Sequence, residues 1–292
     1  MKAYVFPGQA AQFEGMGSDL YTESSVAKQM FDEADSILGY SLSKIMFQGS
    51  LEELTQTKIT QPAVFLHSVI KAKLAESQAP PMGVAGHSLG EFSALVVNKT
   101  LDFESGLRLV QTRANAMQSA CEMQRSIMAA IVGLDDQIIE EICAGIDQLV
   151  VPANYNCPGQ LVISGTIAGV DEAIELCKKA GAKIAVKIAV GGAFHSPLME
   201  PAKKELEAVI AQTKFHEPIC PIYQNVNALA ISDPEQIRQN LNLQLTSPVL
   251  WTKIMQNMVA DGFDQFIEIG GQGTVLRGFF KRFDKTIATD VL

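Results

Sequence analysis

Ser88 lies between two glycines in the segment GHSLG, residues 86–90, directly after a short apolar run and directly before an amphipathic one. The pattern G-x-S-x-G places a serine hydroxyl at the tip of a strand-to-helix turn, where it acts as a nucleophile. The first N–H groups of the following helix would stabilise a developing oxyanion. The same pattern also suits a serine that caps a helix beside closely packed glycines. Because a predicted strand precedes the motif and a predicted helix follows it, we favour the nucleophile.

A serine nucleophile needs a base, and the sequence offers His67, His87, His195 and His216. His67 lies in an apolar helical pattern, which is typical of a core or boundary histidine. His87 is the neighbour of the serine, and neighbouring side chains on an extended elbow point apart. His216 lies in a polar turn, where a histidine is typically exposed to solvent. His195 follows two glycines after a predicted strand, and we expect it to be the general base.

Hydrolases of this kind orient the histidine with an acid that precedes it in the chain. The acids between the serine and His195, such as Asp135, Asp136, Glu140 and Glu141, fall on predicted solvated helix faces. We therefore expect a backbone or amide carbonyl to orient His195 instead.

Strands and helices alternate over the first 125 residues and again after residue 190. Apolar patterns predict strands at 2–8 and 82–86 and helices at 25–39, 60–77 and from Gly90 onward. Thr60 is expected to be the N-cap of the helix at 60–77, with Pro62 in its first turn. Further strands are predicted within 221–228, 264–270 and 286–292. This alternation indicates an α/β fold with a parallel sheet.

The segment 126–190 has a different order of elements. Strands at 127–133, 149–156, 161–165 and 183–190 enclose helices at 135–145 and 170–181. This β-α-β-β-α-β order is that of a ferredoxin-like unit. We therefore predict a discontinuous hydrolase-like α/β domain, residues 1–125 plus 191–292, with a ferredoxin-like insert at 126–190 and a cleft where the two meet.

Composition excludes several classes of protein. The 292 residues are 47% hydrophobic, enough for a sizeable core, yet no apolar stretch approaches the roughly 20 residues of a membrane-spanning helix. The apolar run at the start is too short for a signal peptide, so we expect a cytoplasmic protein. The net charge is 23 − 32 = −9 with no long basic run, which argues against nucleic-acid binding. Five cysteines without a C-x-x-C pair predict reduced, mostly buried thiols and no metal site.

Taken together, these residues resemble the malonyl-CoA:acyl carrier protein transacylases of fatty acid synthesis, and the related acyltransferase domains of polyketide synthases. The matching stretches span nearly the whole chain in the order of that family. They are FPGQ (6–9), TQPAVF (60–65), GHSLGEFSAL (86–95), VQTRANAMQ (110–118), NYNCPGQLVISG (154–165), GGAFHSPLM (191–199), QNVNA (224–228) and QLTSPVLW (244–251).

The resemblance implies ping-pong acyl transfer. Ser88 would attack the thioester of malonyl-CoA with His195 as base, and the phosphopantetheine thiol of acyl carrier protein would then take the malonyl group; no cofactor is implied. The backbone N–H groups of Gln9 and Leu89 resemble the oxyanion hole. Gln244 resembles the residue whose carbonyl orients the histidine.

Substrate-binding residues also follow from the resemblance. Arg113 corresponds to the residue that selects malonyl groups, and it lies one helical turn before Met117 on the same face. An arginine in a helix is otherwise a solvated surface charge. Phe194 resembles the AFH form associated with malonyl rather than methylmalonyl units. Three further residues match positions near the acyl or pantetheine site, although the two asparagines also suit a turn beside Pro158. These are Gln61, Asn154 and Asn156.

The sequence departs from the family in two places. Ala10 stands where the family commonly has glycine, and if that position needs a positive φ, alanine costs about 1 kcal/mol and shifts the Gln9 N–H. Near the end, GGQGTVLRGFF replaces the usual Gly-Pro-Gly.

Other functions remain open on the sequence alone. The acyl-serine could be released by water, as in a proofreading acyl hydrolase, or the carrier could belong to polyketide synthesis; a non-catalytic carrier-binding module is the third alternative. Because acyl carrier proteins are acidic, docking would need a rim of cationic side chains near the cleft. The basic residues considered for this rim are equally well explained as ordinary solvated surface charges. The residues considered are Lys183, Lys187, Arg277, Lys281 and Arg282. We expect a monomer.

Overall fold

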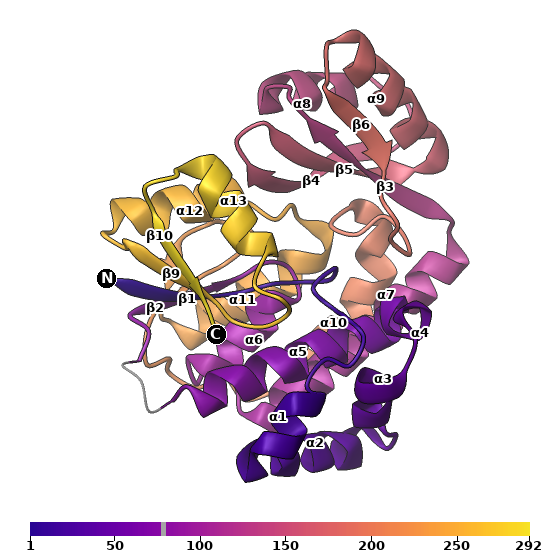
Figure 1. Cartoon of the computed structure of the whole chain (residues 1–292). Coiled ribbons are helices and arrows are strands. Elements are labelled where there is room, and N and C mark those ends of the chain that lie inside the picture. Colours follow the sequence, from indigo (N-terminus) through magenta and orange to yellow (C-terminus); the bar gives the residue numbers. More distant parts are fainter. Residues whose placement is uncertain (77–79) are drawn as a thin grey trace.

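The computed structural model describes residues 1–76 and 80–292, which form two sheets and the helices around them (Figure 1). The larger sheet has the strand order β10-β9-β1-β2-β7-β8. All neighbouring pairs in it are parallel except β7 with β8. The strands are β1 (Lys2–Phe6), β2 (Gly83–Gly86), β7 (Ile222–Tyr223), β8 (Ala230–Ile231), β9 (Gln265–Glu268) and β10 (Ala288–Val291). The α/β fold with a parallel-sheet core is confirmed.

Helices cover both faces of this sheet, and β1 shows why. Tyr4 and Phe6 pack into one hydrophobic cluster, while Ala3 and Val5 pack into another on the opposite face. Successive side chains on a strand point to opposite faces, so a strand buried on both faces is apolar throughout. The helices are α1 (Ser18–Glu23), α2 (Ser25–Leu38), α3 (Leu42–Gln48), α4 (Leu51–Thr55), α5 (Thr57–Leu74), α6 (Gly90–Val97), α7 (Phe103–Met123), α10 (Glu200–Ile210), α11 (Pro234–Leu243), α12 (Trp251–Ala260) and α13 (Val275–Phe283).

The prediction for the start of α5 is wrong. The helix begins at Thr57, and Pro62 lies inside it rather than in its first turn. Instead of capping the helix, the Thr60 hydroxyl donates hydrogen bonds back to the carbonyls of Leu54 and Gln56. Proline removes one backbone donor here, a loss that tertiary packing of this buried helix outweighs. The predicted last residue of the helix, Ser77, lies outside the described residues.

Residues 126–187 form the second sheet, which is antiparallel with the strand order β4-β5-β3-β6. Its strands are β3 (Ser126–Val132), β4 (Val150–Cys157), β5 (Gln160–Thr166) and β6 (Ile184–Lys187), and its helices are α8 (Asp136–Ala144) and α9 (Ile167–Lys179). These elements have their own hydrophobic cluster. The last strand is shorter than the predicted 183–190. The element order and strand order are those of a ferredoxin-like unit.

The antiparallel sheet is hydrogen-bonded to the segment that directly precedes α12. The N–H of Tyr155 in β4 donates to the carbonyl of Val249 at 2.9 Å, and the N–H of Val249 donates to Ala153 at 2.8 Å. β4 also packs against α12 and α13, as the neighbouring ribbons in Figure 1 show. The antiparallel sheet is therefore held next to the loops that leave the parallel sheet.

All five cysteines are buried and free, as predicted. None of the described helices is long and apolar enough to cross a membrane.

Candidate active site

The Ser88 elbow lies at the carboxyl end of β2, where α6 begins. Ser88 has φ 53°, a left-handed conformation that is strained for a residue with a side chain. A Cβ on Gly86 would lie 1.9 Å from the carbonyl carbon of Gly90, and a Cβ on Gly90 would lie 2.1 Å from the carbonyl oxygen of Phe6. Both flanking positions therefore require glycine, because strand and helix backbones meet there.

Ser88 and His195 form a hydrogen-bonded pair, with Oγ 2.7 Å from Nε2. The Nδ1 of His195 faces two backbone carbonyls, Gln244 at 3.0 Å and Ser247 at 3.1 Å. Since carbonyl oxygens only accept, Nδ1 carries the proton and Nε2 is left to accept from the serine hydroxyl. Carbonyl groups from the short helix Gln244–Thr246 and its cap thus occupy the place that an acid has in a Ser-His-Asp triad.

His195 is held neutral. Its burial lowers its pKa to about 3, and the positive charge of Arg113 acts in the same direction, while the bonds to the two carbonyls oppose it. A neutral imidazole at physiological pH is the form that takes a proton from a serine.

Arg113 is a fully buried cation that touches the nucleophile. From α7, its Nη1 donates to the side-chain oxygen of Gln61 at 2.6 Å, and its Nη2 donates to the Oγ of Ser88 at 3.0 Å and to Gln244 at 3.3 Å. Its Nε has no partner among the described residues, and none of the ion pairs there includes it. Burial lowers its pKa to about 9, with the charge of Glu91 opposing, so the guanidinium remains positive at neutral pH. A buried cation held only by neutral groups is arranged to receive an anion.

Gln61 connects the arginine to the loop after β1. Its side-chain nitrogen lies 3.4 Å from the side-chain oxygen of Gln9 and 3.2 Å from the sulfur of Met117. The structure thus brings together Gln61, Met117, Gln9 and Arg113, which the sequence places on three separate segments.

The two N–H groups expected to form an oxyanion hole are unused. No hydrogen bond within residues 1–76 and 80–292 engages the backbone N–H of Leu89 or of Gln9. Ala10, the departure from the family pattern, does have a positive φ of 77°, and its own N–H bonds the side chain of Gln12 at 2.9 Å. The glycine-favouring conformation at this position is therefore retained although glycine is not.

The remaining predicted residues form no hydrogen bond with Ser88 or His195 within the described part of the chain. Phe194 is buried next to His195 in the chain. Asn154 and Asn156 lie in strand β4, so the alternative that they form a turn is wrong. Asn156 accepts a hydrogen bond from Nε2 of His87 at 2.9 Å, which turns His87 away from the serine. Burial lowers the pKa of His87 to about 4.

Sequence reasoning missed Asn225 and Glu91. The side-chain oxygen of Asn225 accepts from the N–H of Ser88 at 2.7 Å, and its nitrogen donates to the carbonyl of Gly86 at 2.6 Å. Glu91 is buried in α6 and accepts from the N–H of Asn225 at 2.8 Å. The available signal was position: Asn225 follows a strand of the parallel sheet, at the edge where the elbow lies.

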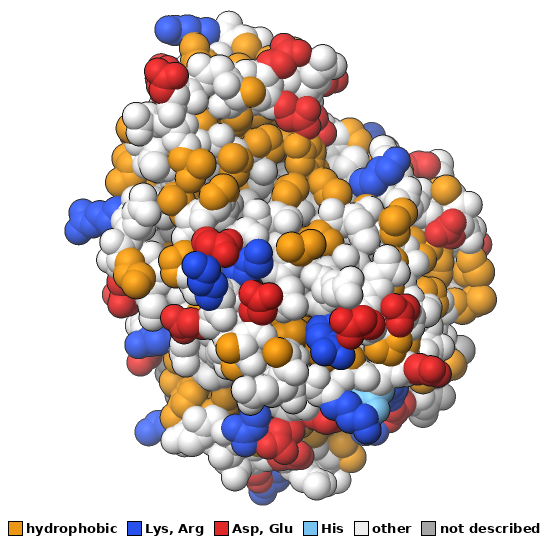
Figure 2. Space-filling model, turned by 180° about the vertical axis from the view of Figure 1, so that it is seen from behind, with side chains coloured by type: hydrophobic (Ala, Val, Ile, Leu, Met, Phe, Trp, Pro, Cys, Tyr) orange, Lys and Arg blue, Asp and Glu red, His pale blue; other side chains and the backbone are white. Residues whose placement is uncertain are grey.

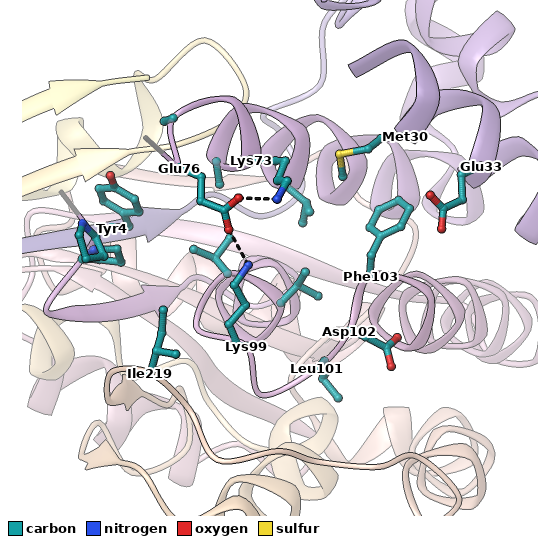
Figure 3. Close-up of a pocket in the computed structure, with 17 residues that line it drawn as sticks. Tyr4, Met30, Glu33, Lys73, Glu76, Lys99, Leu101, Asp102, Phe103 and Ile219 are labelled. Atoms are coloured by element: carbon teal, nitrogen blue, oxygen red, sulfur yellow. Dashed lines mark hydrogen bonds and ion pairs between the residues drawn. The ribbon is translucent and has the colours of Figure 1, made fainter. Parts of the chain in front are cut away.

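A cavity of about 330 Å³ lies elsewhere, between α5, α6 and α7. Figure 3 shows Glu76 at its edge, accepting hydrogen bonds from Lys73 and Lys99, and Phe103 on another wall. None of the predicted site residues lines it, so the site is identified by its hydrogen-bond geometry rather than by the size of a cavity.

A Ser-His pair on a strand-to-helix elbow of an α/β sheet defines a serine-dependent acyl-transfer enzyme. The family model for the acyl transferase domain matches residues 3–290. Malonyl CoA-acyl carrier protein transacylase of Bacillus subtilis is 41% identical over 291 residues, which cover 98% of this chain and 92% of that protein. An acyl carrier protein S-malonyltransferase from Vibrio cholerae has a solved structure that is 41% identical, with a TM-score of 0.95 over 100% of this chain and 96% of that one.

A third relative was solved with its partner, as a type II polyketide-synthase acyl carrier protein in complex with its malonyl-transacylase. It is 40% identical, with a TM-score of 0.95 over 100% of this chain and 95% of that one. The chain therefore belongs to the acyl transferase family, among the malonyl-CoA:acyl carrier protein transacylases. The family expected from the sequence is confirmed, and the protein is an acyltransferase.

Proposed function

We propose that this protein transfers the malonyl group of malonyl-CoA to the phosphopantetheine thiol of acyl carrier protein in fatty acid biosynthesis. The observation that carries the proposal is the fully buried guanidinium of Arg113, which forms no ion pair with any described residue and lies 3.0 Å from the Oγ of Ser88. The carboxylate of a malonyl group lies one methylene from the thioester carbon, so a cation that binds it must lie close to the attacking oxygen.

The proposed chemistry has two symmetrical halves. His195 takes the proton of Ser88 at Nε2 as Oγ bonds to the thioester carbon, and the negative charge on the carbonyl oxygen is met by the N–H groups of Leu89 and Gln9. The tetrahedral intermediate expels the CoA thiolate, which receives the proton from His195. The carrier thiol then loses its proton to His195 and attacks the carbonyl carbon of the malonyl-serine ester. The bond from that carbon to Oγ breaks, and His195 returns the proton to Ser88. Each oxyanion donor contributes roughly 3 to 4 kcal/mol to stabilising the transition state.

Selectivity follows from Arg113. A malonyl carboxylate would accept hydrogen bonds from a guanidinium whose position is fixed by Gln61 and Gln244. Each charge-assisted hydrogen bond is worth about 1.5 to 3 kcal/mol, and an acetyl group forms none of them. The bulk of Phe194 beside His195 would crowd a branch at the α-carbon. Met117, Asn154 and Asn156 complete the proposed substrate-binding set.

The partner is proposed to be an acidic carrier protein, in keeping with the carrier complex of the third relative. Lys183, Lys187, Arg277, Lys281 and Arg282 remain the residues proposed for its docking. Lys187 is paired with Asp171 at 2.7 Å, and Arg282 donates to Gln160. On the face shown in Figure 2, basic and acidic side chains are interspersed. Because the net charge of the chain is −9, docking of an acidic partner would depend on a local group of cations.

Localisation, oligomeric state and the need for cofactors also belong to the proposal. We infer a cytoplasmic monomer that needs no metal or cofactor and binds neither nucleic acid nor membranes. The division into a discontinuous large domain, 1–125 plus 191–292, and an insert at 126–190 agrees with the two separate sheets and with a hydrophobic cluster made only of insert residues. Met128, Ala153 and Val162 of the insert pack into the main cluster of the large domain, so the two parts share an apolar contact.

The test is to mix the protein with malonyl-CoA and holo acyl carrier protein and to follow three products by mass spectrometry. Transferase activity predicts a malonyl adduct on Ser88 and malonyl carrier protein, with neither product in Ser88→Ala. Free malonate as the main product would instead identify a hydrolase, and an unmodified Ser88 would identify a non-catalytic binding module. Carriers from fatty acid and polyketide synthesis, compared side by side, identify the partner by kcat/KM.

A further inference from the structure

The side chain of Asn225 continues the hydrogen-bond ladder between β2 and β7. It does so just beyond the end of β7, where the backbone no longer pairs with β2. β7 pairs with β2 in the register Val84 to Ile222 and Ala85 to Tyr223, and the N–H of Val84 donates to the carbonyl of Pro221 at 3.0 Å. A parallel ladder repeats every two residues. Its next bonds would join the carbonyl of residue 86 to the N–H of residue 225, and the N–H of residue 88 to the carbonyl of residue 225.

The side-chain amide of Asn225 makes both of these bonds. Its nitrogen donates to the carbonyl of Gly86 at 2.6 Å, and its oxygen accepts from the N–H of Ser88 at 2.7 Å. A primary amide has the same donor and acceptor as a peptide group, so it can replace one. The two bonds lie on either side of His87, and the second holds the N–H of Ser88, the residue with the strained positive φ.

The backbone of Asn225 is engaged elsewhere, which fixes the side chain. Its N–H donates to one carboxylate oxygen of Glu91 at 2.8 Å, and its carbonyl accepts from the N–H of Leu250 at 3.0 Å. Gln224 donates to the other oxygen of Glu91 at 3.1 Å. Both groups that Glu91 faces here are donors, as suits an ionised carboxylate, although burial raises its pKa. Glu91 stands three residues after Ser88, so the contacts close a loop around the elbow.

We propose that Asn225, braced by Glu91, is a positioning residue that holds Ser88 in its reactive conformation. It also occupies the N–H of Ser88, which leaves the N–H of Leu89 as the donor of the elbow that is free to meet an oxyanion. This inference rests on the proposed role of Ser88 as nucleophile. Asn225 touches no reacting atom, and its effect is on the rate of acylation rather than on substrate binding.

The test compares Asn225→Ala with wild type in two reactions of Ser88, acylation by malonyl-CoA and modification by a neutral sulfonyl fluoride. A nucleophile displaced by about 1 Å loses on the order of 10²-fold in rate. We expect a loss of that order for both reagents, with the KM for malonyl-CoA changed less than about threefold, because Gln61 and Gln244 hold Arg113 without Asn225.

Asn257→Ala is the matched control. Asn257 also donates from its side chain to a backbone carbonyl after β7, that of Ala228 at 2.8 Å, but it is not bonded to the elbow. We expect it to lose stability and keep the wild-type rate. Glu91→Gln should slow both reactions, and Asn225→Ala with Glu91→Gln should lose less than the product of the single losses, because the two residues act as one unit.

Asn225→Asp separates positioning from folding, since the new side chain has almost the same shape. Its carboxyl still accepts from Ser88, but only its protonated form can donate to the carbonyl of Gly86. The ratio of its acylation rate to that of wild type should therefore rise as pH falls from 8 to 5.

Two results would overturn the inference: wild-type rates in Asn225→Ala, or, if that variant does not fold, a pH-independent ratio for Asn225→Asp. A wild-type protein that malonyl-CoA fails to acylate refutes the proposed function instead, and the sulfonyl fluoride series then still decides the role of Asn225.

Discussion

Nη2 of Arg113 lies 3.0 Å from Oγ of Ser88, so a buried cation is in direct contact with the hydroxyl that His195 is placed to deprotonate. The contact has two consequences. The positive charge of Arg113 helps to keep His195 neutral. The guanidinium is also close enough to Ser88 to bind the carboxylate of an acyl group as short as malonyl. The group that would bind a carboxylate, Arg113, and the base that activates the serine, His195, therefore both contact the same hydroxyl.

Replacing Arg113 with alanine should abolish the preference for malonyl groups. Loss of two charge-assisted hydrogen bonds, about 3 to 6 kcal/mol together, lowers kcat/KM for malonyl-CoA by about 10²- to 10⁴-fold. The value for acetyl-CoA should fall far less, which steady-state assays with both thioesters would measure. Arg108→Ala is the control, because Arg108 lies on the same helix in an exposed pair with Glu104 and should change neither value. Equal losses for both thioesters would contradict the role of Arg113 in selection.

The acylation rate should be nearly independent of pH between 5 and 8. The base must be neutral, and because the pKa of His195 is lowered to about 3, protonation removes it only well below pH 5. In Arg113→Ala the loss of the positive charge should move the acidic decline in rate to higher pH. Single-turnover rates across this range check both statements, and a wild-type rate that halves near pH 6.5 would refute the first.

Folding stability should fall on acidification through the buried histidines. Burial lowers the pKa values of His67 and His87 to about 4 and that of His195 to about 3, whereas the unfolded value is about 6.5. Below pH 6.5 the unfolded chain binds protons that the folded chain does not, so the free energy of unfolding decreases as pH falls from 7 to 5. The loss is about 2 kcal/mol for each histidine, measurable by urea unfolding. His67→Asn should reduce this dependence, and an unchanged dependence in that variant would contradict the role of His67.

Ala10→Gly should stabilise the loop that carries Gln9. Ala10 has φ 77°, a conformation in which alanine is strained by about 1 kcal/mol and glycine is not. The reverse exchange is available at Gly15, which has φ 79° and open space around a new Cβ, so Gly15→Ala should destabilise by a similar amount. Thermal unfolding of the two variants tests the pair. Opposite signs are expected, and a destabilising Ala10→Gly would show that the loop gains nothing from glycine.

Local sequence determined the elements and the nucleophile of this protein. Two glycines around Ser88 between an apolar run and a helical pattern specify an elbow, because backbone contacts at Gly86 and Gly90 leave no room for a Cβ. Helical periodicity and short apolar runs likewise predicted the order of helices and strands along the chain, whereas the order of the strands within the parallel sheet appears only in the structure. The start of α5 was misplaced because packing of a buried helix overrides the local signal of Thr60 and Pro62.

Tertiary structure decided what surrounds the serine. The carbonyl of Gln244 lies 49 residues from His195, and the side chain of Asn225 lies 137 residues from Ser88. No periodic pattern in the sequence predicts such contacts, because they depend on which strand ends and loops the fold brings together. The burial of Arg113 is decided in the same way: a helical pattern allows a solvated arginine, and only the packing of α7 against α5 makes it a buried cation beside Ser88.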